Sequence, residues 1–112
     1  MSDAPFKEID TAEFQAQFQG ENAPGYLLVD VREMHEYDAG HLPGAINIPM
    51  SEIQYRYDEI EPDQTVILVC ATGNRSGMVA GFMAGQGYHD LYNLTDGTMG
   101  WIRRGLPIEK EG

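Results

Sequence analysis

The sequence has only one cysteine, Cys70, so it cannot form an internal disulfide bond. An unpaired thiol fits a reducing compartment, and we therefore expect the protein in the cytoplasm. Long apolar segments are lacking as well. Residues 1–6 contain neither a basic region nor an apolar run, which predicts that there is no signal peptide. No apolar run approaches the roughly 20 residues that cross a bilayer, so a membrane-spanning segment is not expected.

Basic residues are scarce: seven Lys and Arg stand against eighteen Asp and Glu, for a net charge of −11. Nucleic acids and anionic membranes are bound through basic patches, so the composition argues against both as partners. The acidity serves solubility first, but it also repels small anions and attracts basic proteins. An anionic substrate must therefore be held by local hydrogen-bond donors.

What the 112 residues do contain is typical of a globular protein, with 42% hydrophobic and 22% charged residues. We expect a single domain over residues 1–112. Apolar, β-branched segments alternate with segments of helical periodicity, which predicts an α/β fold with a parallel sheet. The expected strands cover residues 6–9, 26–31, 45–48, 65–70 and 91–94, and the expected helical segments cover residues 10–18, 33–38, 51–60, 77–85 and 97–103.

The helix expected at residues 77–85 has two marked features. Gly77, Gly81 and Gly85 recur every four positions, and each interior glycine costs about 1 kcal/mol of helix propensity relative to alanine. This stripe predicts that another backbone packs closely against the helix. Four apolar residues form one face of this helix: Met78, Val79, Phe82 and Met83. The methionines of this face are expected in the core.

Cys70 ends an apolar run and is followed by a short polar turn that contains Gly73. A strand, a tight turn and a helix direct backbone N–H groups into a concavity at the helix N-terminus, where anions bind. A thiol in that concavity has a lowered pKa and becomes reactive. Many lone cysteines are inert core residues, but the carboxyl end of a strand is where open α/β sheets bind ligands. With Arg75 five positions further on, we interpret Cys70 as a nucleophile in an anion-binding loop.

Other polar residues have simpler interpretations. Asp30 ends its strand near this loop and could orient Arg32, Arg75 or a loop amide, but a structural acceptor is favoured over a catalytic role. Histidine is the residue type most often used as a general base, yet attack by a thiolate needs no base, so we expect His41 to be structural. No histidine has metal-ligand spacing, and no metal site is predicted. We expect His35 and His89 in solvent. Trp101 is expected in the core.

Four segments, taken in order, resemble the motifs of the single-domain rhodaneses, which are thiosulfate sulfurtransferases. Residues 70–76, Cys-Ala-Thr-Gly-Asn-Arg-Ser, resemble the active-site loop of that family. Residues 28–32, followed by Glu36 and Tyr37, resemble its second strand and the turn after it. The first and the C-terminal signatures of the family are matched by residues 40–49 and by residues 96–101 with 105–107, so that the resemblance covers roughly residues 26–108.

The resemblance implies a five-stranded, largely parallel sheet flanked by helices. It also implies that the Cys70 thiolate attacks the sulfane sulfur of thiosulfate, releases sulfite, and passes the sulfur from a persulfide to cyanide or a thiol. Arg75 would pair with the incoming anion, with Asp30 and Arg32 in supporting roles. The implied partners are a small anionic sulfur donor and a thiol-bearing protein acceptor, and neither a metal nor an organic cofactor is required. The loop residues that would bind the substrate are Ala71, Thr72, Gly73, Asn74, Arg75 and Ser76.

Alternatives to this free enzyme stay open. One is a sulfur carrier or partner-binding module, in which the persulfide goes to a dedicated protein with little turnover on cyanide. Another is a phosphatase or arsenate reductase of the same fold. Their loops have one more residue between nucleophile and arginine, so the shorter spacing from Cys70 to Arg75 disfavours them. A non-catalytic scaffold is disfavoured by the presence of the nucleophile. Arg75 is the only cation of the loop, which predicts that thiosulfate is a poor substrate and another persulfide donor is preferred.

Overall fold

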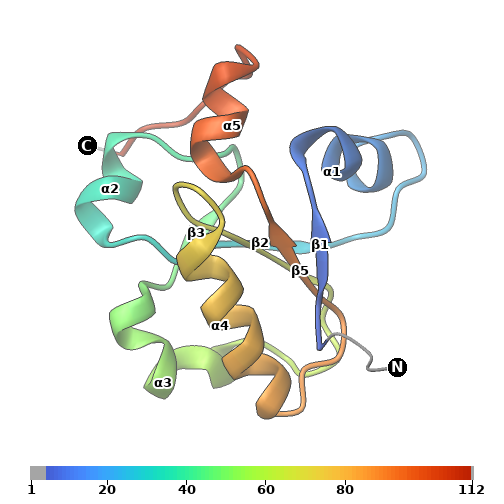
Figure 1. The fold of residues 1–112 in the computed structure, drawn as a ribbon, viewed down its shortest axis with the longest axis vertical. Coiled ribbons are helices and arrows are strands. Elements are labelled where there is room, and N and C mark those ends of the chain that lie inside the picture. Colours follow the sequence, from blue (N-terminus) through green and yellow to red (C-terminus); the bar gives the residue numbers. More distant parts are fainter. Residues whose placement is uncertain (1–4, 112) are drawn as a thin grey trace.

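The computed structural model describes residues 5–111. Residues 1–4, which carry most of the expectation about a signal peptide, lie outside this range. Five strands form one sheet in the order β1-β5-β4-β2-β3, and all neighbouring strands are parallel (Figure 1). The predicted fold class is therefore confirmed. The strands are β1 (Lys7–Ile9), β2 (Leu27–Asp30), β3 (Ile46–Asn47), β4 (Val66–Val69) and β5 (Leu91–Leu94).

Helices cover both faces of the sheet (Figure 1). The first and last α-helices pack on one face, and the third and fourth pack on the other. Because β4 is covered on both sides, all four of its residues are buried, and its sequence is continuously apolar. Among residues 5–111, every helix is too short or too polar to traverse a bilayer. The helices are α1 (Thr11–Phe18), α2 (Met34–Ala39), α3 (Ile53–Arg56), α4 (Asn74–Gly85) and α5 (Gly97–Arg103), with short 3-10 turns η1 (Met50–Glu52) and η2 (Tyr57–Glu59) on either side of α3.

The start of α4 differs from the sequence-based expectation. The helix begins at Asn74 rather than at Gly77, because Gly73 turns the chain immediately before it with a φ of 92°. A residue without a Cβ adopts this left-handed conformation at little cost. Arg75 and Ser76 therefore lie in the first turn of the helix and not in the preceding loop.

The predicted close packing against the glycine stripe of α4 is wrong for two of its three members. A Cβ at Gly81 or Gly85 would meet nothing within 4 Å, whereas one at Gly77 would lie 3.2 Å from Asn93 Nδ2. The periodicity of the stripe does not reveal which side of the helix faces the sheet. In the structure Gly81 and Gly85 are exposed.

Replacing Gly81 with alanine is expected to stabilise the protein by up to about 1 kcal/mol. The position is helical, exposed and free of neighbours, so the methyl group adds helix propensity without a clash. Urea unfolding followed by circular dichroism measures the change. A loss of stability would contradict the open environment of this glycine.

The expectation of core methionines on α4 is half right. Met83 and Val79 are fully buried, but the side chain of Met78 is 66% exposed. Met78 lies at the rim of a pocket between α4 and α3 instead of over the sheet.

Candidate active site

Cys70 follows the last residue of β4, at the carboxyl edge of the sheet. Its Sγ accepts a hydrogen bond from the backbone N–H of Gly73 at 3.1 Å and lies 3.3 Å from the hydroxyl of Ser76. The residue is only 1% exposed. The sulfur thus faces the turn and the first helical turn of α4, as a nucleophile in the predicted loop requires.

The environment of Cys70 favours the thiolate. Burial by itself raises the pKa of the Cys70 thiol, because it penalises the charged form. Hydrogen bonds from the hydroxyl and backbone N–H of Ser76 and from the N–H groups of Thr72 and Gly73 act in the opposite direction. These donors prevail, and the pKa of Cys70 is lowered from its ordinary value of 9.0.

Asn93 on β5 holds the donors around Cys70 in place. Its Nδ2 donates to the carbonyl of Gly73 at 3.0 Å, and its Oδ1 accepts from the Ser76 hydroxyl at 2.5 Å. That hydroxyl carries one proton, so it donates either to Asn93 or to the cysteine sulfur at any moment. Asn93 is not among the site residues predicted from the sequence, although an amide inside a buried strand is a signal that could have identified it.

The first turn of α5 supports the same loop from the other side. The N–H groups of Thr98 and Met99 donate to the carbonyls of Cys70 and Ala71 at 2.9 and 3.0 Å. Gly97 makes this contact possible, because a Cβ there would lie 2.4 Å from the carbonyl oxygen of Ala71. The sequence motif contained this glycine, but only the structure shows that it supports the cysteine loop.

Arg75 is paired with Glu36, a residue that is not among the site residues predicted from the sequence. Its guanidinium donates to both carboxylate oxygens of Glu36 on α2, at 2.7 and 3.0 Å. The Arg75 hydrogen bond lowers the pKa of Glu36 from 4.5 to about 2, and the pairing raises the pKa of Arg75. Glu36 also accepts the N–H of Glu33 at 3.0 Å and so caps its own helix. The only cation of the loop is therefore matched by a carboxylate that stays ionised at neutral pH.

This pairing predicts a pH-dependent effect of the Glu36→Gln variant on stability. A carboxyl group whose pKa is lowered by folding stabilises the protein above its unfolded pKa, near 4.5, and loses this contribution as the pH falls toward 2. The variant should therefore be less stable than the wild type at neutral pH and equally stable near pH 2. Chemical unfolding at a series of pH values measures the difference.

Glu59→Gln is the matched control for that experiment. The Arg56 hydrogen bond lowers the pKa of Glu59 too, but Glu59 lies in solvent, where water screens the interaction. Its substitution should change the pH profile less than that of Glu36. Profiles that change equally would show that the pair at the cysteine loop is no stronger than a surface pair.

Asp30 and Arg32 form a buried ion pair at the end of β2. Arg32 Nη2 donates to Asp30 Oδ2 at 2.8 Å and to the carbonyl of Gly40 at 2.6 Å. Asp30 also accepts the backbone N–H of Arg32 at 2.9 Å. Asp30 thus orients Arg32, one of the three partners considered for it, and the pair fastens the chain after β2 to the end of α2.

The histidines and the tryptophan occupy the structural positions expected from the sequence. His41 is 1% exposed, stacks on Tyr37 with ring centroids 3.8 Å apart, and donates from Nδ1 to the Tyr37 carbonyl at 2.8 Å. Trp101 is buried in the core, whereas His35 and His89 are exposed.

Comparisons with known proteins agree with this architecture. The sequence model of the Rhodanese-like domain matches residues 10–104. A sulfurtransferase of Allochromatium vinosum is 40% identical over 82 residues, which are 73% of this chain and 77% of that protein. The thiosulfate sulfurtransferase GlpE of Actinobacillus succinogenes is 34% identical over 104 residues, 93% of this chain and 91% of that protein. A rhodanese-related protein from Thermoplasma volcanium, known from a crystal structure, is 30% identical in sequence. The two structures superpose with a TM-score of 0.82 over 94% of this chain and 99% of that protein's chain.

Proposed function

Because this chain belongs to the rhodanese-like domain family, we propose that it is a sulfurtransferase that works through a persulfide on Cys70. The observation that carries the proposal is the position of the sulfur. Sγ lies against the Gly73 N–H and the Ser76 hydroxyl, and its pKa is lowered. The sulfurtransferases among the relatives support the same class of reaction.

The proposed reaction has two displacements at sulfur. In the first, the Cys70 thiolate attacks the outer sulfur of thiosulfate or an organic persulfide donor. A bond forms between Sγ and that sulfur, the sulfur–sulfur bond of the donor breaks, and the leaving group, sulfite for thiosulfate, departs with the electron pair. In the second, cyanide or an acceptor thiolate attacks the terminal sulfur, and the Cys70 thiolate is released. Both steps are nucleophilic displacements in which the leaving group takes the electron pair and no external oxidant or reductant is consumed, so the proposed cycle needs no metal or organic cofactor.

The residues around Cys70 have distinct parts in this proposal. The loop residues 71–76 would hold the transferred sulfur, with the N–H groups of Thr72, Gly73 and Ser76 as the donors nearest to it. Asp30 and Arg32 would act only by holding the end of β2. Five positions from Cys70 to Arg75 favour a sulfur cradle over the wider loop of a phosphatase or arsenate reductase.

A second candidate function is delivery of the persulfide to a dedicated protein with little free turnover. The net charge of −11 favours a basic protein as the thiol-bearing acceptor. Transfer to such an acceptor would be faster than transfer to cyanide and would slow as salt is added. The lone thiol supports a reducing compartment such as the cytoplasm for either function.

Intact-mass spectrometry tests the proposed function. After incubation with thiosulfate or with an organic persulfide donor, the protein should gain the mass of one sulfur atom. Cyanide should remove that sulfur and form thiocyanate. If no donor of either type adds sulfur to the folded protein, the proposal is wrong.

A further inference from the structure

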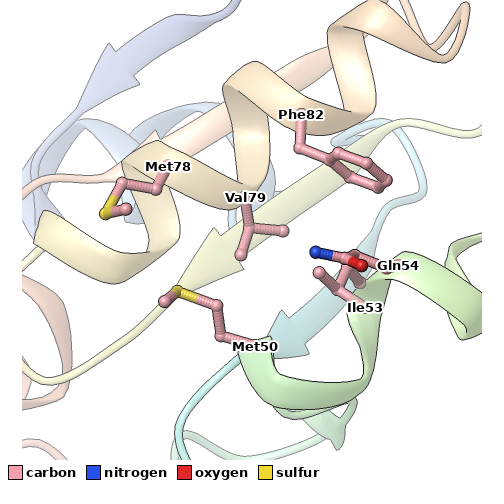
Figure 2. A pocket seen from close by; sticks show the side chains of 6 residues that line it. All are labelled: Met50, Ile53, Gln54, Met78, Val79 and Phe82. Carbon is pink, nitrogen blue, oxygen red and sulfur yellow. The ribbon is translucent and has the colours of Figure 1, made fainter.

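A pocket of about 210 Å³ opens between α4 and the segment formed by η1 and α3 (Figure 2). None of its lining side chains is charged, and only one of them is polar. Met50 and Met78 lie at the end of the pocket where β4 ends, and Phe82 and Gln54 lie toward the other end (Figure 2). The lining residues are Met50, Ile53, Gln54, Met78, Val79 and Phe82.

The pocket begins within one helical turn of a residue that contacts Cys70, because Val79 is three positions after Ser76, whose hydroxyl lies 3.3 Å from Sγ. Val79 and Cys70 belong to one cluster of buried residues, and Met50 packs against that cluster. On α4, Met78, Val79 and Phe82 lie three, four and seven positions after Arg75, so these residues share one face of the helix. A molecule whose sulfur reaches Cys70 can therefore extend along this face into the pocket.

The charges around the pocket select against inorganic dianions. Arg75, at the Cys70 end, is already paired with Glu36. Arg56, on the helix that supplies Ile53, is paired with two carboxylates, at 2.7 and 2.9 Å. A thiosulfate dianion thus finds these two arginines already paired, in a protein whose own net charge is −11. The available contacts are apolar, so they favour a sulfur donor that has a hydrocarbon group and a smaller charge than thiosulfate.

The size of the pocket limits the occupant further. Its volume of about 210 Å³ lies below the roughly 300–1,000 Å³ of sites that hold drug-sized ligands. A small alkyl or aryl group fits this space, whereas a helix or a protein loop does not.

We propose that this pocket is a subsite for the apolar group of a low-molecular-weight organic sulfur donor, R–S–SH or a thiosulfonate, which binds with its outer sulfur at Cys70. The inference rests on the proposed function and adds the class of donor to it. In the step concerned, the Cys70 thiolate bonds to the outer sulfur, the donor's sulfur–sulfur bond breaks, and the thiolate or sulfinate that carries the apolar group leaves with the electron pair.

Three donors separate the effect of charge from that of the apolar group. Thiosulfate is a dianion without carbon, methanethiosulfonate is a monoanion with a methyl group, and benzenethiosulfonate is a monoanion with a ring. We measure kcat/KM for each, with cyanide as acceptor, in the wild type and in Met78→Gln and Phe82→Leu. For each protein, the aryl-to-methyl ratio is kcat/KM for benzenethiosulfonate divided by kcat/KM for methanethiosulfonate. Comparing the ratio of a variant with that of the wild type cancels the intrinsic reactivity of the two donors.

Met78→Gln is expected to lower the aryl-to-methyl ratio about tenfold, the usual effect of losing a small apolar contact in a binding pocket. Phe82→Leu should lower it as well. The matched control is Met34→Gln on α2, because Met34 is 64% exposed, close to the 66% of Met78, but does not line the pocket. It should leave the ratio within about twofold of the wild type.

The outcomes distinguish failure of the proposed subsite from failure of the proposed function. Ratios that stay unchanged in both pocket variants, with all donors active, would overturn the subsite and leave the proposed function standing. A ratio that falls equally in Met34→Gln would also overturn it, since the effect would then not be local. If no donor transfers sulfur to Cys70 in the wild type, the proposed function itself fails.

Discussion

Replacing Cys70 with serine is expected to lower kcat/KM for sulfur transfer by more than about a thousandfold, in line with the loss of other catalytic nucleophiles. A serine hydroxyl is not ionised near neutral pH, and its oxygen cannot carry a persulfide. The donors that lower the pKa of the thiol are fixed by the backbone and by Asn93, so they remain in place around the new hydroxyl. The loss should therefore be chemical and not structural. Thiocyanate formation from cyanide measures it.

Ser76→Ala is the matched control for that variant. It removes the hydroxyl 3.3 Å from Sγ but keeps the nucleophile and the backbone donors. Activity should persist. The pH at which activity increases should be higher than in the wild type, because the Ser76 hydroxyl helps to lower the pKa of Cys70. Both variants should unfold cooperatively in a thermal melt. A Cys70→Ser protein that retains activity within tenfold of the wild type would rule out a persulfide on this residue.

Gly73→Ala is expected to destabilise the protein by about 2–4 kcal/mol and to raise the pKa of Cys70. Gly73 has a φ of 92°, and a Cβ there would lie 2.4 Å from the carbonyl oxygen of Thr95. The backbone of Thr95 cannot move aside as a flexible side chain could, so the turn at Gly73 must shift to accommodate the added Cβ. The N–H that donates to Sγ at 3.1 Å moves with it. Urea unfolding and the pH dependence of thiol alkylation measure the two effects.

Gly87→Ala separates the clash from the backbone strain. Gly87 has a similar φ of 97°, but a Cβ there would meet nothing within 4 Å. Its substitution should cost only the left-handed conformation, about 1–2 kcal/mol, and leave the Cys70 pKa unchanged. Equal losses of stability in the two variants would show that the contact with Thr95 yields easily.

The elements with strong local signals were predictable. The helix expected over residues 10–18 forms as α1, where Asp10 and Glu13 cap its start with reciprocal side-chain-to-backbone hydrogen bonds of 2.8 and 2.9 Å. β5 and α5 have the expected bounds. These features depend on neighbouring residues only, which is why a single sequence contains them. The start of α4 was misplaced because Gly73 functions as a cap through its φ, which composition alone does not specify.

The parts of the site that were missed come from distant segments. Asn93 reaches Gly73 and Ser76 from β5, and Glu36 reaches Arg75 from α2. Hydrogen bonds of this kind depend on which strands are adjacent and on how far each helix is rotated. The glycines at 81 and 85 show the same limit, since their spacing was visible but the side they face was not.

The amino-acid sequence by itself determined the alternation of strands and helices, the single thiol at a strand end, and the polar turn after it. Each of these follows from local periodicity and from the conformational preferences of individual residues. Only the tertiary structure decided that the loop cation is neutralised by Glu36 and that an uncharged pocket opens between α4 and the η1–α3 segment. Charge balance and cavity shape arise where segments far apart in the chain pack together, so no local pattern encodes them.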